Sequence, residues 1–198
     1  MRPAPPHPGT PALRLGLLAT LLLLLLAWGP AARAWELSGR KDITAVTRDQ
    51  QRITLGSVLF TPQADGSVRF SVDMDYRPFV DHFLSMKEFK CLQGPDEVLC
   101  HVPYPYKNPG TVRAGDYAWL EHQLLFLFKQ PRDFGAKLWN GLYFRLEQGT
   151  DGLVALPQAV DLNLISAPPD DLLTPPYSAG LRDEVAPGAH WIERLLIR

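Results

Sequence analysis

Residues 89–102 read FKCLQGPDEVLCHV and carry the two cysteines of the 198-residue chain. If Cys91 stands opposite Cys100 in an antiparallel hairpin, Gln93 stands opposite Val98 and the loop closes over residues 94–97. Opposed residues of such a pair lie roughly 4.5 to 5.5 Å apart at Cα, within the roughly 4.4 to 6.8 Å that a disulfide tolerates. The stretch therefore predicts a hairpin bridged by a Cys91–Cys100 disulfide.

Two free thiols and a pair of metal ligands are the alternatives for these cysteines. A metal site needs further ligands at close spacing, and the sequence has no third cysteine and no close pair of histidines. Two cysteines in an exported chain generally pair, because the compartment is oxidising. By the loop-entropy model such a bridge contributes about 2 to 3 kcal/mol.

The first 34 residues have the three parts of a secretory signal peptide. Arg2 and Arg14 provide a positive start, residues 15–28 form an apolar run, and Ala32-Arg33-Ala34 fits the small-x-small pattern of a cleavage site. We predict that residues 1–34 are a cleaved signal peptide and that residues 35–198 form a single exported globular domain.

An uncleaved membrane anchor is the alternative for this segment. The apolar run has about 14 residues, whereas a spanning helix needs roughly 20. No cysteine follows the run directly, so a lipoprotein-type anchor has no attachment point. We expect a soluble protein in a periplasm or outside the cell, with no stable membrane anchor after cleavage.

The charge balance argues against a nucleic-acid partner. The chain has 20 basic and 21 acidic residues and a formal net charge of −1 at pH 7. Its basic residues form no block, whereas phosphate binding requires clustered lysine and arginine. We therefore expect no binding to nucleic acid.

Short alternating segments separated by turn residues are typical of antiparallel strands, and they dominate this chain. The clearest hairpin joins residues 52–60 to residues 68–75. Further strands are expected at residues 137–147, 153–156, 159–165 and 190–198, with a bulge permitted by Gly141. The predicted fold is mainly β with minor α (α+β): an antiparallel β-meander or barrel-like sheet with one or two short helices.

Two segments favour a helix. Residues 76–90 have apolar side chains at three- and four-residue spacing, with Pro78 in the first turn. Residues 116–129 have Asp116 as a candidate N-cap and a broad apolar face. The dense run at residues 124–128 fits a buried strand as well, because periodicity alone cannot separate the two. We interpret both segments as helices and keep a strand as the alternative for residues 116–129.

Four aromatic residues are candidates for ligand binding: Tyr104, Tyr106, Trp139 and Tyr143. The first two lie in Val-Pro-Tyr-Pro-Tyr-Lys-Asn-Pro, where three prolines favour a rigid extended path. Tyrosine combines a flat apolar face with a polar tip, which suits stacking on sugars, peptides or prolines. The alternative is that these rings simply cover the core.

Three acids form a second candidate site: Asp73, Asp75 and Asp161. The first two alternate on one strand, about 7 Å apart on one face, a spacing that can hold a cation or a pair of catalytic carboxylates. Alternating acids on an exposed face are more often merely solvated. The sequence gives no distance from either to Asp161.

Motifs of the common enzyme classes are absent, among them the Gly-x-Ser-x-Gly elbow, His-Glu-x-x-His, the phosphate-binding loop and the dinucleotide fingerprint. We therefore expect no cofactor and no metal, and favour a non-catalytic module that binds an unknown small ligand or protein partner. A carboxylate-dependent hydrolase and a structural envelope component are the alternatives. The oligomeric state is left open.

Overall fold

One antiparallel sheet contains every strand in the described part of the protein. The structure is a computed structural model, and it describes residues 1–4, 35–84 and 87–198. In chain order the strands are β1 (Gly39–Thr47), β2 (Arg52–Pro62), β3 (Val68–Met74), β4 (Val80–Leu84), β5 (Lys87–Gln93), β6 (Val98–His101), β7 (Thr111–Val112), β8 (Phe126–Lys129), β9 (Gly141–Gln148), β10 (Leu153–Val160), β11 (Asp183–Glu184) and β12 (Ile192–Ile197).

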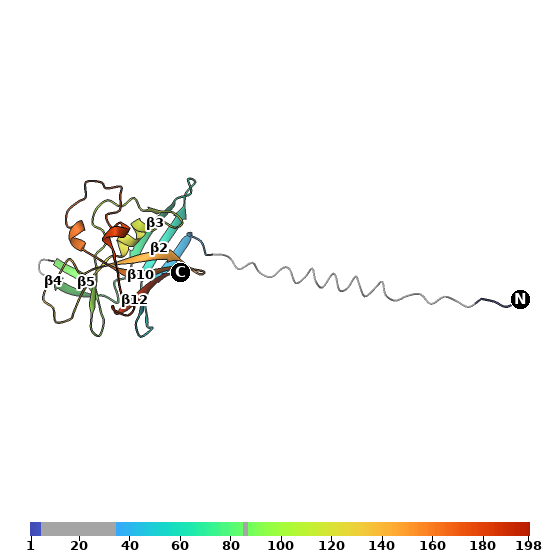
Figure 1. The fold of residues 1–198 in the computed structure, drawn as a ribbon, viewed down its shortest axis with the longest axis horizontal. Coiled ribbons are helices and arrows are strands. Elements are labelled where there is room, and N and C mark those ends of the chain that lie inside the picture. The colour runs from blue at the N-terminus through green and yellow to red at the C-terminus, as the bar shows by residue number, and fades with distance from the viewer. Residues whose placement is uncertain (5–34, 85–86) are drawn as a thin grey trace. The chain divides into compact units, whose positions relative to one another are not determined.

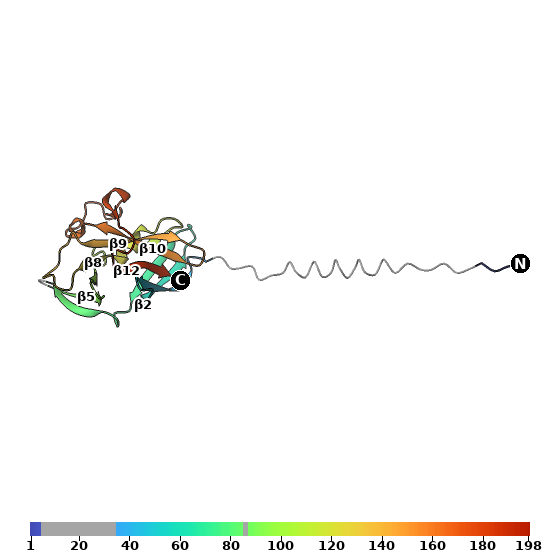
Figure 2. The same cartoon turned by 60° about the horizontal axis from the view of Figure 1, so that its bottom comes forward.

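The strand order is β4-β5-β6-β8-β9-β10-β12-β1-β2-β3-β7, with β11 paired to β10 off this path. The last strand, β12, lies between β10 and β1 and so joins the two halves of the sheet. Figures 1 and 2 show β5 at the other end of the fold from β2. The predicted antiparallel, mainly β fold is confirmed, in the form of one open sheet.

Helical structure is confined to short turns on the described chain. One α-helix, α2 (Ala118–Glu121), continues into the 3-10 turn η1 (His122–Leu124). Two further 3-10 turns are η2 (Leu162–Ile165) and η3 (Ala179–Leu181). The chain thus has the minor α content that the sequence predicts.

The cysteine hairpin forms in the predicted register. Cys91 pairs with Cys100 and Gln93 with Val98 across β5 and β6, and the two cysteines form a disulfide. Their Cα atoms are 3.9 Å apart, slightly closer than the expected range. Gly94 N donates to Glu97 O at 2.8 Å and closes the turn. A disulfide of this kind is typical of exported proteins.

The helix predicted for residues 76–90 is wrong. This stretch contributes β4 and β5, which pair from Val80 opposite Cys91 to Leu84 opposite Lys87. The apolar spacing misleads because Val80 and Phe83 are exposed on an edge strand, while within β4 only Leu84 is buried. Pairing with the disulfide hairpin outweighs the local three- and four-residue pattern.

The helix predicted for residues 116–129 is right only for its first part. After α2 and η1 the chain becomes strand β8, so the alternative holds for residues 126–129. Phe128 pairs with Leu99 of β6, and Phe126 pairs with Leu142 of β9. Phe126, Leu127 and Lys129 are buried and Phe128 is half-buried, so both faces of β8 are covered, which accounts for its continuous apolar run.

The segment from 137 to 165 also differs from its prediction. Residues 137–140 form a turn, with Asn140 N bonded to Lys137 O at 2.9 Å, and β9 starts at Gly141. Residues 153–160 form one strand rather than two, and η2 replaces the expected strand end. Gly141 is required by close packing, since a Cβ there would lie 2.6 Å from Val160 O.

Residues 35–198 form one compact unit. The predicted signal peptide and its cleavage after Ala34 fall mainly on residues 5–34, outside the described residues, and stay a prediction. Within the described part of the chain, no helix has the length and apolar character needed to cross a membrane.

Candidate functional site

A cleft of about 650 Å³ opens where three segments meet: the β5–β6 turn, the loop after β8 and the segment before β12. Phe128, Trp191 and two prolines supply its apolar walls. Its polar lining consists of Asp96, Glu97, Lys129, Gln130, Arg132, Asp133, Asn140 and His190. These residues come from distant parts of the sequence, and the sheet order brings them together.

Glu97 connects two of the three segments. Its Oε1 accepts a hydrogen bond from His190 Nδ1 at 2.6 Å, and its Oε2 accepts one from Trp191 N at 2.8 Å. Gly94 permits this approach, because a Cβ at this glycine would lie 2.4 Å from the Trp191 ring. The buried carboxylate therefore has both oxygens engaged by protein donors.

His190 is held in one orientation. Because its Nδ1 carries the proton donated to Glu97, the neutral ring presents Nε2 as an acceptor. Phe128 packs against the ring edge-on, with centroids 4.6 Å apart. Among the described residues no hydrogen-bond partner is found for Nε2. The arrangement supplies an oriented imidazole in the cleft lining, and His190 also lines a neighbouring hollow with Glu184 and Ile192.

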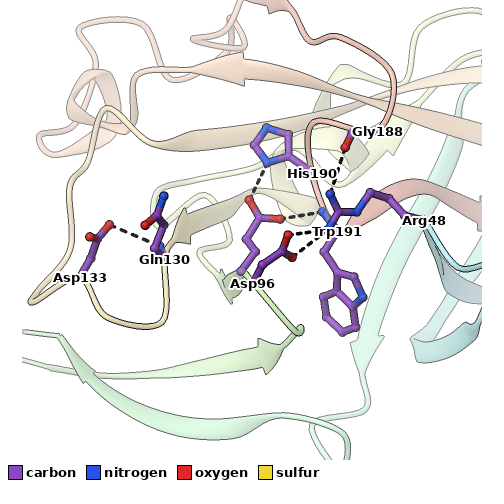
Figure 3. A network of polar contacts seen from close by, with 8 residues as sticks. Arg48, Asp96, Gln130, Asp133, Gly188, His190 and Trp191 are labelled. Carbon is purple, nitrogen blue, oxygen red and sulfur yellow. Dashed lines mark hydrogen bonds and ion pairs between the residues drawn. The ribbon is translucent and has the colours of Figure 1, made fainter.

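Asp96, next to Glu97, is engaged from outside the cleft. Arg48 Nη2 donates to both of its carboxylate oxygens, at 2.8 and 2.7 Å, and Arg48 Nη1 donates to Gly188 O at 3.3 Å (Figure 3). This bidentate pair joins the β1–β2 loop to the β5–β6 turn and to the segment before His190. It braces the wall that carries Glu97.

The end of β8 and the loop after it contribute two cations, Lys129 and Arg132, and one acid, Asp133, to the lining. The buried Lys129 donates through Nζ to Gln130 O at 2.9 Å and to Pro131 O at 3.4 Å, which leaves one of its three protons over. Arg132 Nε donates to Gln130 Oε1 at 3.1 Å. Asp133 accepts a hydrogen bond from Gln130 N at 3.3 Å. Each acid of the cleft thus already accepts from a protein donor, while the cations retain unused N–H groups.

The aromatic candidates from the sequence lie mostly elsewhere, inside the fold. Tyr104 and Tyr143 are 4 % and 0 % exposed, and both pack edge-on against the ring of His122, at 5.7 and 5.4 Å. Tyr106 packs on Tyr104 at 5.5 Å. Trp139 is 64 % exposed in the turn before β9 and so lies apart from the buried Tyr143.

His122 is a buried, neutral member of this aromatic cluster. Its Nδ1 donates to Ala118 O at 2.6 Å, and its Nε2 accepts from Tyr177 N at 3.3 Å. Burial lowers the pKa of His122 to about 4. Both ring nitrogens are therefore committed to the backbone, and this histidine has a structural role.

The neighbouring Glu121 is buried as well. Tyr143 donates its hydroxyl proton to one oxygen of the carboxylate, and Leu146 N donates to the other at 2.6 Å. Burial raises the pKa of this carboxyl, against the opposing effect of the two hydrogen bonds. Glu121 lines a second cleft, of about 430 Å³, together with Tyr143 and Tyr177.

The three candidate acids do not gather at one place. Asp73 and Asp75 line a shallow hollow together with Arg77, as the alternation on β3 predicts. The Asp73 side chain is 80 % exposed. Hydrogen bonds from Arg77 lower the pKa of Asp75 to about 2. Asp161 does not line that hollow; it accepts from Asn163 N at 2.9 Å and caps η2.

Sequence reasoning missed Glu97, Lys129 and His190. Glu97 and His190 are 93 residues apart, so no local spacing links them. The one available signal was the position of Glu97 in the hairpin turn, where a buried acid requires a partner.

In the part of the chain that is described, no group of three His, Cys, Asp or Glu side chains is placed to hold a metal ion. No protein-family model matches the chain, and no curated protein or solved structure is similar to it.

Proposed function

We propose that this protein is an exported, non-catalytic binding protein, and that the cleft at Glu97 and His190 takes up a small carboxylate that also carries a hydroxyl group. The disulfide supports export, since such bonds persist in oxidising compartments. The predicted signal peptide agrees with this assignment.

One observation carries the ligand assignment: the acids of the cleft are engaged by the protein, whereas its cations and one imidazole nitrogen are open. Lys129 and Arg132 have unused N–H donors that suit a carboxylate. His190 Nε2, oriented by Glu97, suits a hydroxyl donor. The carboxylate of a hydroxy acid can accept from Lys129 and Arg132, and its hydroxyl can donate to His190 Nε2. Its carbon chain can lie against Phe128 and Trp191.

The lining also favours binding over hydrolysis. A carboxylate that orients a histidine occurs in nucleophilic enzymes, but there the histidine activates a serine, threonine or cysteine. No residue of these types is among those that line this cleft in the described chain. The cleft has an oriented base without a side chain for it to activate.

Isothermal titration calorimetry with L-malate tests the proposal. We expect binding to the wild type and at least an about tenfold loss in Lys129→Met, because a charge-assisted hydrogen bond contributes about 1.5 to 3 kcal/mol. Lys137→Met, at an exposed lysine outside the cleft lining, is the matched control and should bind like the wild type. Succinate, which lacks the hydroxyl, should bind more weakly than malate.

Absence of malate, succinate and citrate binding to the wild type would refute the proposal. Equal losses in Lys129→Met and Lys137→Met would show that the binding is not located in the cleft.

A further inference from the structure

A second cleft, formed by α2, β9 and the segment after Tyr177, holds a cation of the chain itself. The Cζ atom of Arg182 lies 4.7 Å from the centroid of the Tyr143 ring. Three tyrosines and two acids line this cleft: Tyr117, Tyr143, Tyr177, Asp116 and Glu121. Aromatic faces combined with carboxylates are the chemistry by which proteins recognise organic cations.

A buried carboxylate, that of Glu121, supplies negative charge to this cleft. Glu121 is 5 % exposed, and its carboxylate is fixed by Tyr143 and by Leu146 N. The positive charge of Arg182 favours its ionised form. A carboxylate at this depth requires a cation nearby, because its solvation by water is lost.

Arg182 is held loosely in comparison. Its Nε donates to Ser178 O at 3.3 Å, and no carboxylate of the described residues lies within 4.0 Å of its guanidinium. The preceding turn η3 has no buried residue, and its Leu181 is exposed. We refer to residues 178–182 as the strap.

Both ends of the strap are anchored. Before it, Tyr177 donates through its hydroxyl to Asp161 O at 3.0 Å and through its backbone N to His122 at 3.3 Å. After it, Glu184 pairs with Gln158 of β10 and accepts a side-chain hydrogen bond from it at 2.7 Å. Between these anchors, Leu181 N and Arg182 Nε both donate to Ser178 O, within the strap itself.

We propose that this second cleft is a recognition site for an organic cation, a guanidinium or alkylammonium group, and that Arg182 occupies it until such a ligand displaces the strap. The ligand's cation takes the place of the Arg182 guanidinium over the Tyr143 ring, in the cleft that Glu121 also lines. The site is separate from the cleft at Glu97 and does not depend on the function proposed for that cleft.

The test is calorimetry with 1-butylguanidinium and with its neutral isostere butylurea. Arg182→Ala should bind butylguanidinium at least about tenfold more tightly than the wild type, because the ligand then no longer has to displace the Arg182 guanidinium from the Tyr143 ring. Arg182→Gln, which removes the charge and retains most of the volume, should do the same. Butylurea has no positive charge and should bind to neither variant. The comparison tests whether binding requires a charge opposite to that of the Glu121 carboxylate, without substituting Glu121.

Arg40→Ala is the matched control, because Arg40 is an exposed arginine outside the lining of this cleft and pairs with Asp73. It should bind like the wild type. The proposal is overturned if both Arg182 variants bind butylguanidinium no better than the wild type, or if butylurea binds them equally well.

Discussion

Glu97 accepts a hydrogen bond from His190 Nδ1 at 2.6 Å, although 93 residues separate them in the chain. The same carboxylate accepts from Trp191 N at 2.8 Å. One buried acid therefore connects the disulfide hairpin to the start of β12, the strand that joins the two halves of the sheet. The connection also fixes the imidazole that lines the cleft.

Glu97→Ala should lower the free energy of unfolding by about 1 to 3 kcal/mol, because it leaves the buried Trp191 N–H without an acceptor. Urea denaturation of the variant and the wild type measures this loss. Glu88→Ala, at an exposed position of β5, is the control and should change little. Equal effects of the two substitutions would contradict the bridging role of Glu97.

Replacing both cysteines by alanine should lower the free energy of unfolding by about 2 to 3 kcal/mol, since the bridge restricts the unfolded chain. The Cys91–Cys100 loop is short, so we expect a local effect on β5 and β6 without loss of the fold. Residue-resolved hydrogen exchange measures the size of this loss of stability and shows which strands it affects. Faster exchange spread evenly over the sheet would speak against a local role.

Buried His122 should make the wild type less stable as the pH falls from about 6.5 to about 4. The unfolded chain binds a proton near pH 6.5, whereas the folded protein resists protonation until about pH 4. The unfolded state therefore takes up more protons in this window, and stability is lost by up to about 3 kcal/mol. Glu121, whose pKa is raised by burial, acts in the opposite direction.

His122→Asn retains a donor for Ala118 O but does not titrate. The difference in unfolding free energy between wild type and variant, measured by urea denaturation at several pH values, isolates the contribution of His122. We expect this difference to shrink as the pH falls below 6.5. A difference that is constant with pH would show that His122 does not titrate as we infer.

Gly56→Ala should destabilise the sheet by about 2 kcal/mol or more, because an added Cβ would force a strained backbone and a clash. Gly56 has a φ of +144°, and a Cβ there would lie 2.2 Å from Asp73 O. Gly180→Ala is the control, since no atom lies within 4 Å of its Cβ position. Thermal unfolding distinguishes the two; similar midpoints would contradict the packing at Gly56.

Local pattern was sufficient for the elements whose partners are close in sequence. The β2–β3 and β5–β6 hairpins form as predicted, because alternation and a turn residue specify both strands at once. Local pattern was insufficient for β4 and β8, because their conformation depends on the strands with which they pair. Phe83 and Phe128 have helix-compatible spacing, and only the pairing of their strands decides the structure.

The candidate site could be predicted even less. Tyr104 and Tyr143 meet around His122, but in the interior rather than on a surface. Glu97 and His190 meet only because β12 inserts between β10 and β1, which no local signal indicates. Burial of a charged side chain is a property of the assembled sheet, and the sequence does not display it.

The most direct test of the proposed function is an NMR titration of histidine-labelled protein with L-malate, up to about 10 mM. We expect the chemical shifts of the His190 ring to change with saturation. Those of His82 and His122, which lie outside the cleft lining, should not change. An unchanged His190 signal over the whole titration would contradict the assignment of this cleft as the ligand site.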